Sequence, residues 1–399
     1  MAILGQVALG YSPFIERTRT LTATRLCVFP LRPDAALDVA QLLEAVALVW
    51  PAESGKVLLN IVSESLLHDL LQASPAANVM IEVPNFMALD PANTDALLRL
   101  HAAGVCLLLK GRPKSELPAH ALACFKYSVI DLDDDRRTGD AIDASSGVSR
   151  CVLPVLSGVH SVADMESAFA RGAHAVLGWP IEETAEAAAS TAAKPKPQAN
   201  LQAIVDLMRG VDRQDPIEDL EAILKRDPSI AFQLLRHMNS PAFGLRVEVS
   251  SFRHAIMMLG YQRLKRWLAL LLATASKDVN LRPLMFAAIR RGLLMEELVA
   301  DAGDDEMKNE AFICGVFSLL DRMFGETFEK LLDKIPVPER VFQALVNDIG
   351  PFEPCLAMIR AVEAESLFDY REAAGRLLMS FGAINRCAMR ALRAANDLG

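Results

Sequence analysis

The chain has 399 residues, a length that suits two domains of ordinary size rather than one. Apolar residues make up 52% of it and charged residues 23%, which is the balance of a well-packed globular protein and excludes an extended disordered one. The net charge of −9 argues against binding to nucleic acid, and no run of apolar residues is long enough to span a membrane.

Seven cysteines are scattered along the chain, mostly within apolar runs, and none belongs to a CxxC pair. This pattern predicts buried free thiols rather than a disulfide or zinc framework. The N-terminal residues show neither the positive lead nor the cleavage pattern of a signal peptide, and no phosphate-binding loop or dinucleotide fingerprint follows. We therefore expect a cytoplasmic protein without a cofactor, a bound metal or a membrane segment.

The first 180 residues alternate short apolar runs with longer amphipathic segments. Seven runs predict strands buried on both faces, at 25–30, 56–62, 78–83, 104–110, 127–132, 151–156 and 174–179. Leucines and alanines recur at helical spacing between them, over 35–50, 63–73, 91–103 and 161–171. Repeated βα units of this kind predict an α/β fold, either a (β/α)8-type barrel or a doubly wound sheet.

The second half carries helix signals only. Residues 184–199 are rich in alanine and proline and predict a linker. Asp215-Pro216 and Asp227-Pro228 each place a capping carboxylate before a proline, which marks a helix start. Apolar faces at helical spacing predict an all-helical bundle, over 263–275, 285–302, 310–324, 338–347 and 373–394.

The run from 226 to 245, followed by 251–268, resembles the HDOD family. These helical domains are related to HD-type phosphohydrolases but lack their metal chemistry. The matching elements are Asp227-Pro228, Asn239-Ser240, Phe243-Gly244, Ala255 and Leu259-Gly260. With that domain downstream, the segments 12–29, 58–67, 79–86 and 158–183 are similar, in this order, to segments of an EAL domain. The first half thus resembles this barrel, which in active members hydrolyses cyclic di-GMP with two divalent metals.

A barrel followed by an HDOD domain is the order found in the YuxH-type signalling proteins of bacteria. On this resemblance we predict an EAL-like (β/α)8-type barrel over 1–183, an Ala/Pro-rich linker over 184–199 and an all-helical HDOD domain over 200–399.

The resemblance also predicts that the barrel has lost its catalytic residues. Hydrolysis by two metals needs several carboxylates at strand ends, yet Arg25 stands where the family has a signature glutamate, and Lys110-Gly111 replace a pair of aspartates. Asn60, Glu82 and Asp131 keep the family's residue types. The remaining altered positions are Val129 for a lysine, Ser157 and His160 for glutamates, and Leu177 for a glutamine.

The helical half lacks the metal ligands of its catalytic relatives as well. HD hydrolases bind their metal with several histidines and a His-Asp dyad. Here Ser318-Leu319 occupy the dyad positions, and no histidine follows His254. The resemblance therefore implies no metal-dependent hydrolysis by this half.

Other polar features of the helical half are interpreted structurally. His237 and His254 lie beside apolar residues and are interpreted as structural histidines. Asn239-Ser240 precede a proline and predict a turn. The basic edge from Arg263 to Trp267 is interpreted as a solvated helix face rather than an anion site.

Three functions remain open. The first is a non-catalytic regulatory protein that acts through protein–protein contacts. The second is a receptor that binds cyclic di-GMP or another nucleotide without hydrolysing it, at a barrel mouth formed by Arg25, Asn60, Glu82, Lys110 and Asp131. The two cations could instead pair with Glu82 and Asp131 and close the mouth. The third is a residual metal-dependent phosphodiesterase. Homo-oligomerisation stays open.

Overall fold

The computed structural model describes residues 2–32, 37–111, 117–134, 152–182, 199–226, 230, 252–274, 278–301 and 304–398. Its contacts divide the chain into two compact units. The first contains Met1–Ala188 together with Ala357–Asn396, and the second contains Ala189–Leu356 with the last three residues. The boundary between the two units falls within helix α17 (Glu353–Glu363).

Eight strands close into a barrel in the order β1 to β8. They are β1 (Val7–Glu16), β2 (Leu21–Pro30), β3 (Lys56–Ile61), β4 (Val79–Pro84), β5 (Cys106–Lys110), β6 (Phe125–Asp131), β7 (Leu153–Ser157) and β8 (Ala175–Leu177). From β2 to β8 each strand is parallel to the next. The predicted barrel is confirmed, and the alternative of an open doubly wound sheet is wrong.

Strand β1 differs from the parallel pattern that the sequence indicates, because it runs antiparallel to both β2 and β8. A short turn over 17–20 joins β1 to β2, with Arg19 at a φ of 63°. So short a connection can only return the chain antiparallel, since parallel neighbours need a long crossover. The N-terminal half of β1 therefore lies at the same end of the barrel as the C-terminal ends of the other strands.

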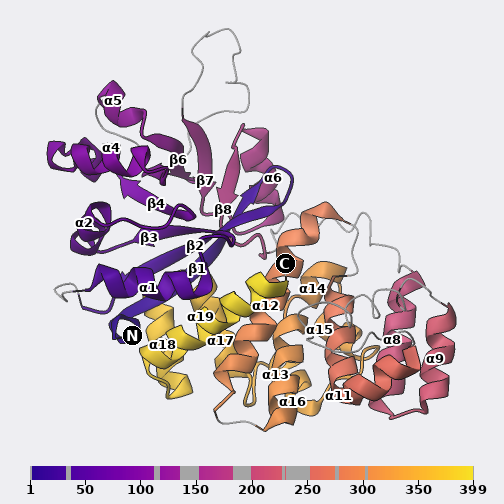
Figure 1. Cartoon of the computed structure of the whole chain (residues 1–399). Helices are drawn as coiled ribbons and strands as arrows, with labels where there is room; N and C mark the ends of the chain where they lie inside the picture. The colour runs from indigo at the N-terminus through magenta and orange to yellow at the C-terminus, as the bar shows by residue number, and fades with distance from the viewer. Residues whose placement is uncertain are drawn as a thin grey trace. The chain divides into compact units, whose positions relative to one another are not determined.

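Helices surround the strands of the barrel (Figure 1). They are α1 (Val39–Val49), α2 (Glu64–Gln72), α3 (Asn85–Leu89), α4 (Thr94–Ala102), α5 (Ala119–Leu122) and α6 (Val162–Ala170), with single 3₁₀ turns at η1 (Ile3–Gly5) and η2 (Pro91–Asn93). Helix α6 begins with a capping box between Ser161 and Asp164. Helix α2 buries its leucines against the barrel side, as its apolar spacing predicts.

The barrel interior is filled at mid-height by apolar side chains. Every strand contributes to this cluster, which contains Phe14, Ala23, Leu58, Met80, Leu108, Tyr127, Val129, Val155, Ala175 and Leu177. Because side chains alternate across a strand, these residues identify the inward-facing register of each strand.

Two C-terminal helices belong to the barrel unit. The sequence predicts one apolar face over 373–394, but Leu378 adopts a left-handed φ of 54° and separates α18 (Leu367–Leu377) from α19 (Phe381–Leu398). Figure 1 shows both helices, in yellow, next to β1 and the N-terminus. By its contacts, the segment 357–396 groups with the barrel in the first compact unit, and the helical domain over 200–399 stays a prediction.

Asn385 attaches α19 to β1. Its side chain is fully buried, its Nδ2 donates to the carbonyl oxygens of Leu4 and Val7 at 2.7 and 2.8 Å, and its Oδ1 accepts from the Leu9 amide at 3.2 Å. The hydroxyl of Tyr370 in α18 donates to the same oxygen at 2.8 Å. One amide side chain thus satisfies four buried polar groups from three segments.

The second unit is helical throughout its described part, which confirms the all-helical prediction. Its elements are α8 (Ala199–Asp212), α9 (Ile217–Arg226), α11 (Phe252–Ala273), η4 (Val279–Leu281), α12 (Arg282–Leu298), α13 (Asp305–Phe317), α14 (Leu320–Phe324), α15 (Phe328–Leu332) and α16 (Glu339–Val346). Helix α9 starts after Asp215-Pro216 as predicted, whereas Asp227-Pro228, His237, Asn239-Ser240 and Phe243-Gly244 lie outside the described residues.

Helices α12 and α13 approach each other closely at two glycines. A Cβ atom on Gly315 would lie 2.5 Å from the carbonyl oxygen of Arg291, and one on Gly292 would lie 3.0 Å from that of Phe312. Only glycine allows the two backbones to lie so close together.

The described helices include none that combines the length and the hydropathy needed to cross a bilayer. The six described cysteines are free thiols, and five of them are buried.

Candidate functional site

A polar layer lies directly above the apolar core at the open end of the barrel. One inward-facing position beyond the core cluster, the strands present Ser12, Arg25, Asn60, Glu82 and Lys110. Four of these residues were predicted from the sequence to gather at the barrel mouth, and the structure brings them together. Ser12 was not predicted, because it requires the antiparallel direction of β1.

Arg25 and Glu82 form a bidentate ion pair. The Nε atom of Arg25 donates to Glu82 Oε1 at 2.5 Å, and its Nη2 donates to Glu82 Oε2 at 2.9 Å. Arg25 is 7% exposed and Glu82 only 1%. The planar guanidinium fits a carboxylate in this two-point geometry, which makes it among the stronger kinds of ion pair. Both carboxylate oxygens of Glu82 are thereby occupied.

Lys110 reaches the same carboxylate from β5. Its Nζ lies 3.7 Å from Glu82 Oε2 and donates to Asn60 Oδ1 at 2.7 Å. The Nδ2 atom of Asn60 in turn donates to Cys27 Sγ at 3.1 Å. The side chain of Lys110 is 40% exposed, so it is the cation of this network that meets solvent.

Glu365 is a further acid at the mouth that sequence reasoning missed. It lies between α17 and α18. Its Oε2 accepts a hydrogen bond from Arg25 Nη1 at 2.7 Å, and its Oε1 accepts one from Ser12 Oγ at 2.6 Å. A Cβ atom on Gly10 would lie 3.1 Å from Glu365 Cα, so glycine on β1 is required for this approach. The C-terminal helices of the barrel unit thus place a carboxylate inside the mouth.

The backbone at Glu365 explains why no sequence signal identified it. Its φ is 53°, and the amides of Glu365 and Ser366 donate to the carbonyl oxygens of Val362 and Ala361. This is the Schellman motif, in which glycine is the ordinary residue at the left-handed position. A glutamate there costs about 1 kcal/mol or more in backbone strain. Its ion pair with Arg25 offsets that cost.

Charge and burial shift the pKa values of two groups in this network. Burial opposes the charge of Arg25, yet the carboxylates of Glu82 and Glu365 hold its pKa well above the usual value. Burial raises the pKa of the Cys27 thiol strongly, and the nearby Arg25 opposes that shift only in part. Arg25 is therefore permanently charged and Cys27 stays a protonated, unreactive thiol.

Asp131 lies apart from the Arg25 network. Its Oδ2 accepts from Ser157 Oγ at 3.4 Å, and its Oδ1 accepts from the amide of Asp133 at 3.1 Å. A Cβ atom on Gly158 would lie 3.0 Å from Asp131 Oδ2. The pairing of both cations with Glu82, which the sequence left open, is thus present in the structure, whereas neither cation is paired with Asp131 among the described contacts.

The other altered positions of the barrel have structural surroundings. Val129 and Leu177 are buried members of the apolar core. Gly111 follows β5 at a φ of 82° and donates its amide to the carbonyl oxygen of Val129. His160 is exposed, with Nδ1 4.0 Å from a carboxylate oxygen of Glu182.

These residues do not fit a pair of divalent cations. Such ions require several oxygen ligands each, mostly from carboxylates. Glu82 is bound to Arg25 through both oxygens, and Lys110 adds a second positive charge to the same place. Within the described parts of the chain, no group of three or more His, Cys, Asp and Glu residues is arranged to hold a metal.

The dyad positions of the helical unit are part of its packing. Ser318 Oγ donates to the carbonyl oxygen of Gly315 at 2.7 Å and accepts from Arg291 Nη1 at 3.1 Å, while Leu319 is buried. The buried guanidinium of Arg291 therefore contacts Ser318, one of the two positions that the sequence resemblance aligns with the dyad. On the basic edge, Lys265 pairs with Asp212 and Arg266 with Glu296.

The helical half matches a known family. Residues 195–333 match the HDOD domain. A stretch of 169 residues is 25% identical to YuxH, an uncharacterized protein of Bacillus subtilis, and covers 40% of each chain. Another of 144 residues is 25% identical to CdgJ of Vibrio cholerae, described as a cyclic di-GMP phosphodiesterase, and covers 36% of this chain and 33% of CdgJ. The chain thus spans well under half the length of either relative.

The solved structures that resemble part of this chain include EAL domains. The phosphodiesterase MucR in complex with cyclic di-GMP gives a TM-score of 0.33 at 19% identity, over 45% of this chain and 98% of that one. The FimX EAL domain of Pseudomonas aeruginosa, also bound to cyclic di-GMP, gives 0.32 at 15% identity, over 46% and 92%. Residues 195–333 therefore match the HDOD domain, as the sequence predicted, and a closed eight-stranded barrel precedes this stretch in the chain.

Proposed function

We propose that this chain is a non-catalytic bacterial signalling protein that regulates its targets through protein–protein contacts. The observation that carries the proposal is the bidentate ion pair between Arg25 and Glu82 at the barrel mouth. It places a permanent cation where two-metal hydrolysis would need a carboxylate, and it occupies the one buried acid of the polar layer that could serve as a ligand.

The energy of this pair supports the proposal. A divalent cation that took Glu82 as a ligand would leave Arg25, at 7% exposure, with only the partly exposed Glu365. Breaking a buried ion pair on one side costs about 3–5 kcal/mol. Lys110 would repel the same ion from within 3.7 Å of the carboxylate.

Because the relative CdgJ is described as a phosphodiesterase, an assay of hydrolysis is the direct test. The purified chain is expected to leave cyclic di-GMP intact in the presence of Mg²⁺ or Mn²⁺, since its mouth cannot assemble two metals. Chromatographic separation of linear from cyclic dinucleotide measures this, with an active EAL enzyme as positive control. Metal-dependent cleavage that disappears in Glu82→Gln would overturn the proposal.

A second candidate function is a receptor for cyclic di-GMP or another nucleotide that is not cleaved. Two observations favour it. The side chain of Lys110 is 40% exposed, so a ligand could reach its charge. Arg25 Nη1 and Ser12 Oγ both donate to the carboxylate of Glu365, which is an anion, as a phosphate group is. In this function Glu365 would compete with the ligand.

The receptor function makes its own prediction for Glu365→Gln. Loss of the competing charge is expected to tighten binding of cyclic di-GMP by about tenfold, which corresponds to one charge-assisted hydrogen bond. Isothermal titration calorimetry of the wild type and the variant measures the change. Absence of heat from both proteins removes the receptor function and leaves the regulatory one.

We also infer that the protein is located in the cytoplasm. Its six described cysteines are free thiols, which is the state that reducing compartments maintain.

A further inference from the structure

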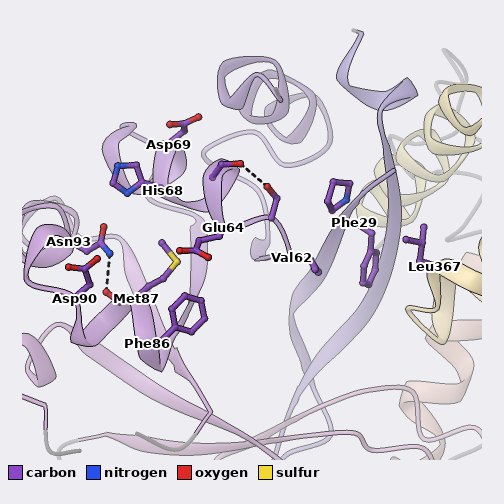
Figure 2. A pocket seen from close by; sticks show the side chains of 13 residues that line it. Phe29, Val62, Glu64, His68, Asp69, Phe86, Met87, Asp90, Asn93 and Leu367 are labelled. Atoms are coloured by element: carbon purple, nitrogen blue, oxygen red, sulfur yellow. Dashed lines mark hydrogen bonds between the residues drawn. The ribbon is translucent and has the colours of Figure 1, made fainter. Parts of the chain in front are cut away.

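A surface groove of about 830 Å³ opens at the mouth end of the barrel. Its walls follow the C-terminal ends of three neighbouring strands, because Phe29 and Pro30 close β2, Val62 follows β3, and Phe86 follows β4. Leu367 of α18 completes it. Figure 2 shows Phe29 and Leu367 on one side of the groove and Phe86 and Met87 on the other.

The two sides of this groove expose large apolar side chains. Phe86 is 55% exposed and Val62 is 54% exposed, and Phe29 and Leu367 are half-buried. Contiguous apolar surface of this kind on a folded protein marks a contact site more often than chance exposure. An aromatic ring set in a concave surface is also the usual anchor of a protein interface.

The rim of the groove is acidic. Glu64 and Asp69 of α2 belong to its lining, and so does Asp90 at the end of α3. His68 is the one residue of the lining that can carry a positive charge, and no lysine or arginine belongs to it. Within the described contacts, Glu64 and Asp69 have no ion-pair partner.

We propose that this groove docks a short segment of a partner protein in which an apolar side chain is flanked by lysine or arginine. The proposal rests on the regulatory function above and names the chemistry of its partner. The apolar side chain would pack between Phe29, Phe86 and Val62, where water is displaced from both surfaces. The flanking cations would face the carboxylates of Glu64, Asp69 and Asp90, which selects such segments over acidic ones.

The charge of the rim argues against an anionic occupant. A nucleotide or another phosphate would meet three carboxylates and no lysine or arginine in this lining. The cations that could attract phosphate, Arg25 and Lys110, belong to the network inside the mouth and are not part of the groove.

Selection from a phage-displayed library of short random peptides, with the full chain as bait, tests the proposal. The enriched peptides are expected to carry lysine or arginine next to leucine, phenylalanine or methionine. Binding of a selected peptide, measured by fluorescence anisotropy, is expected to weaken about tenfold in Phe86→Ala combined with Val62→Ser. It should also weaken in Glu64→Gln combined with Asp69→Asn and at high salt.

Two matched variants outside the groove control for general effects. Leu98→Ala removes another exposed apolar side chain, at 39% exposure, and Asp95→Asn removes another exposed helix carboxylate. Both are expected to bind the peptide as the wild type does. Enrichment of acidic peptides, no enrichment, or binding that the groove variants leave unchanged would each refute the proposal. Because none of these readouts involves cyclic di-GMP, cleavage of the dinucleotide would refute the proposed function without affecting this result.

Discussion

Replacing Glu82 by glutamine is expected to destabilise the barrel unit by about 3–5 kcal/mol, because it leaves a buried guanidinium without its main counter-charge. Arg25 would keep only Glu365 as an acidic partner, and Lys110 would lose its ion pair with Glu82. Urea unfolding followed by tryptophan fluorescence measures the change. A Trp267→Phe background restricts the signal to Trp50 and Trp179, which both lie in the barrel unit.

The double variant Arg25→Leu with Glu82→Leu serves as the control for this prediction. It removes both charges together, and replacing a complete buried pair by apolar residues is often neutral or stabilising. Recovery of most of the lost free energy of unfolding is therefore expected. If the single variant unfolds within about 1 kcal/mol of the wild type, as ordinary surface changes do, the ion pair does not have the buried character that its geometry indicates.

Replacing Asn385 by leucine is expected to cost at least about 3 kcal/mol, since each buried polar group left without a partner costs about 1–3 kcal/mol. The change leaves the carbonyl oxygens of Leu4 and Val7, the amide of Leu9 and the hydroxyl of Tyr370 without this partner. The same fluorescence transition reports the loss, although Asn385 lies 376 residues from Leu9 in the sequence.

Asn396→Ala is the matched control in the same helix. Its Nδ2 makes one part-buried hydrogen bond, to the carbonyl oxygen of Val49 at 3.3 Å, so a loss of about 1 kcal/mol or less is expected. Equal and small effects of the two substitutions would mean that α19 is not part of the folded barrel unit. A large effect of Asn385→Leu alone would establish that a fragment ending before 357 lacks a part of its barrel.

The sequence by itself determined the local elements of this protein. Seven apolar runs predicted β2 to β8, and apolar residues at helical spacing predicted the helices between them, because these patterns depend only on which side chains face a core within one element. The sequence also determined which residue types reach the barrel mouth. Arg25 and Lys110 occupy inward positions beyond the apolar core whatever their partners are.

The tertiary structure alone decided which charges meet. Arg25 can bind Glu82, 57 residues away, or Glu365, 340 residues away, and no periodic pattern connects residues at such separations. It binds both. Closure of the barrel brings Glu82 of β4 to Arg25 of β2, and the packing of 357–396 with the barrel brings Glu365 to the same guanidinium. The hydrogen bonds of Asn385 to the N-terminal segment, and the close approach of Gly10 to Glu365, exist only because of this packing. The membership of the C-terminal helices in the barrel unit, and with it the ion pair between Glu365 and Arg25, depends on contacts between distant segments that local sequence cannot encode.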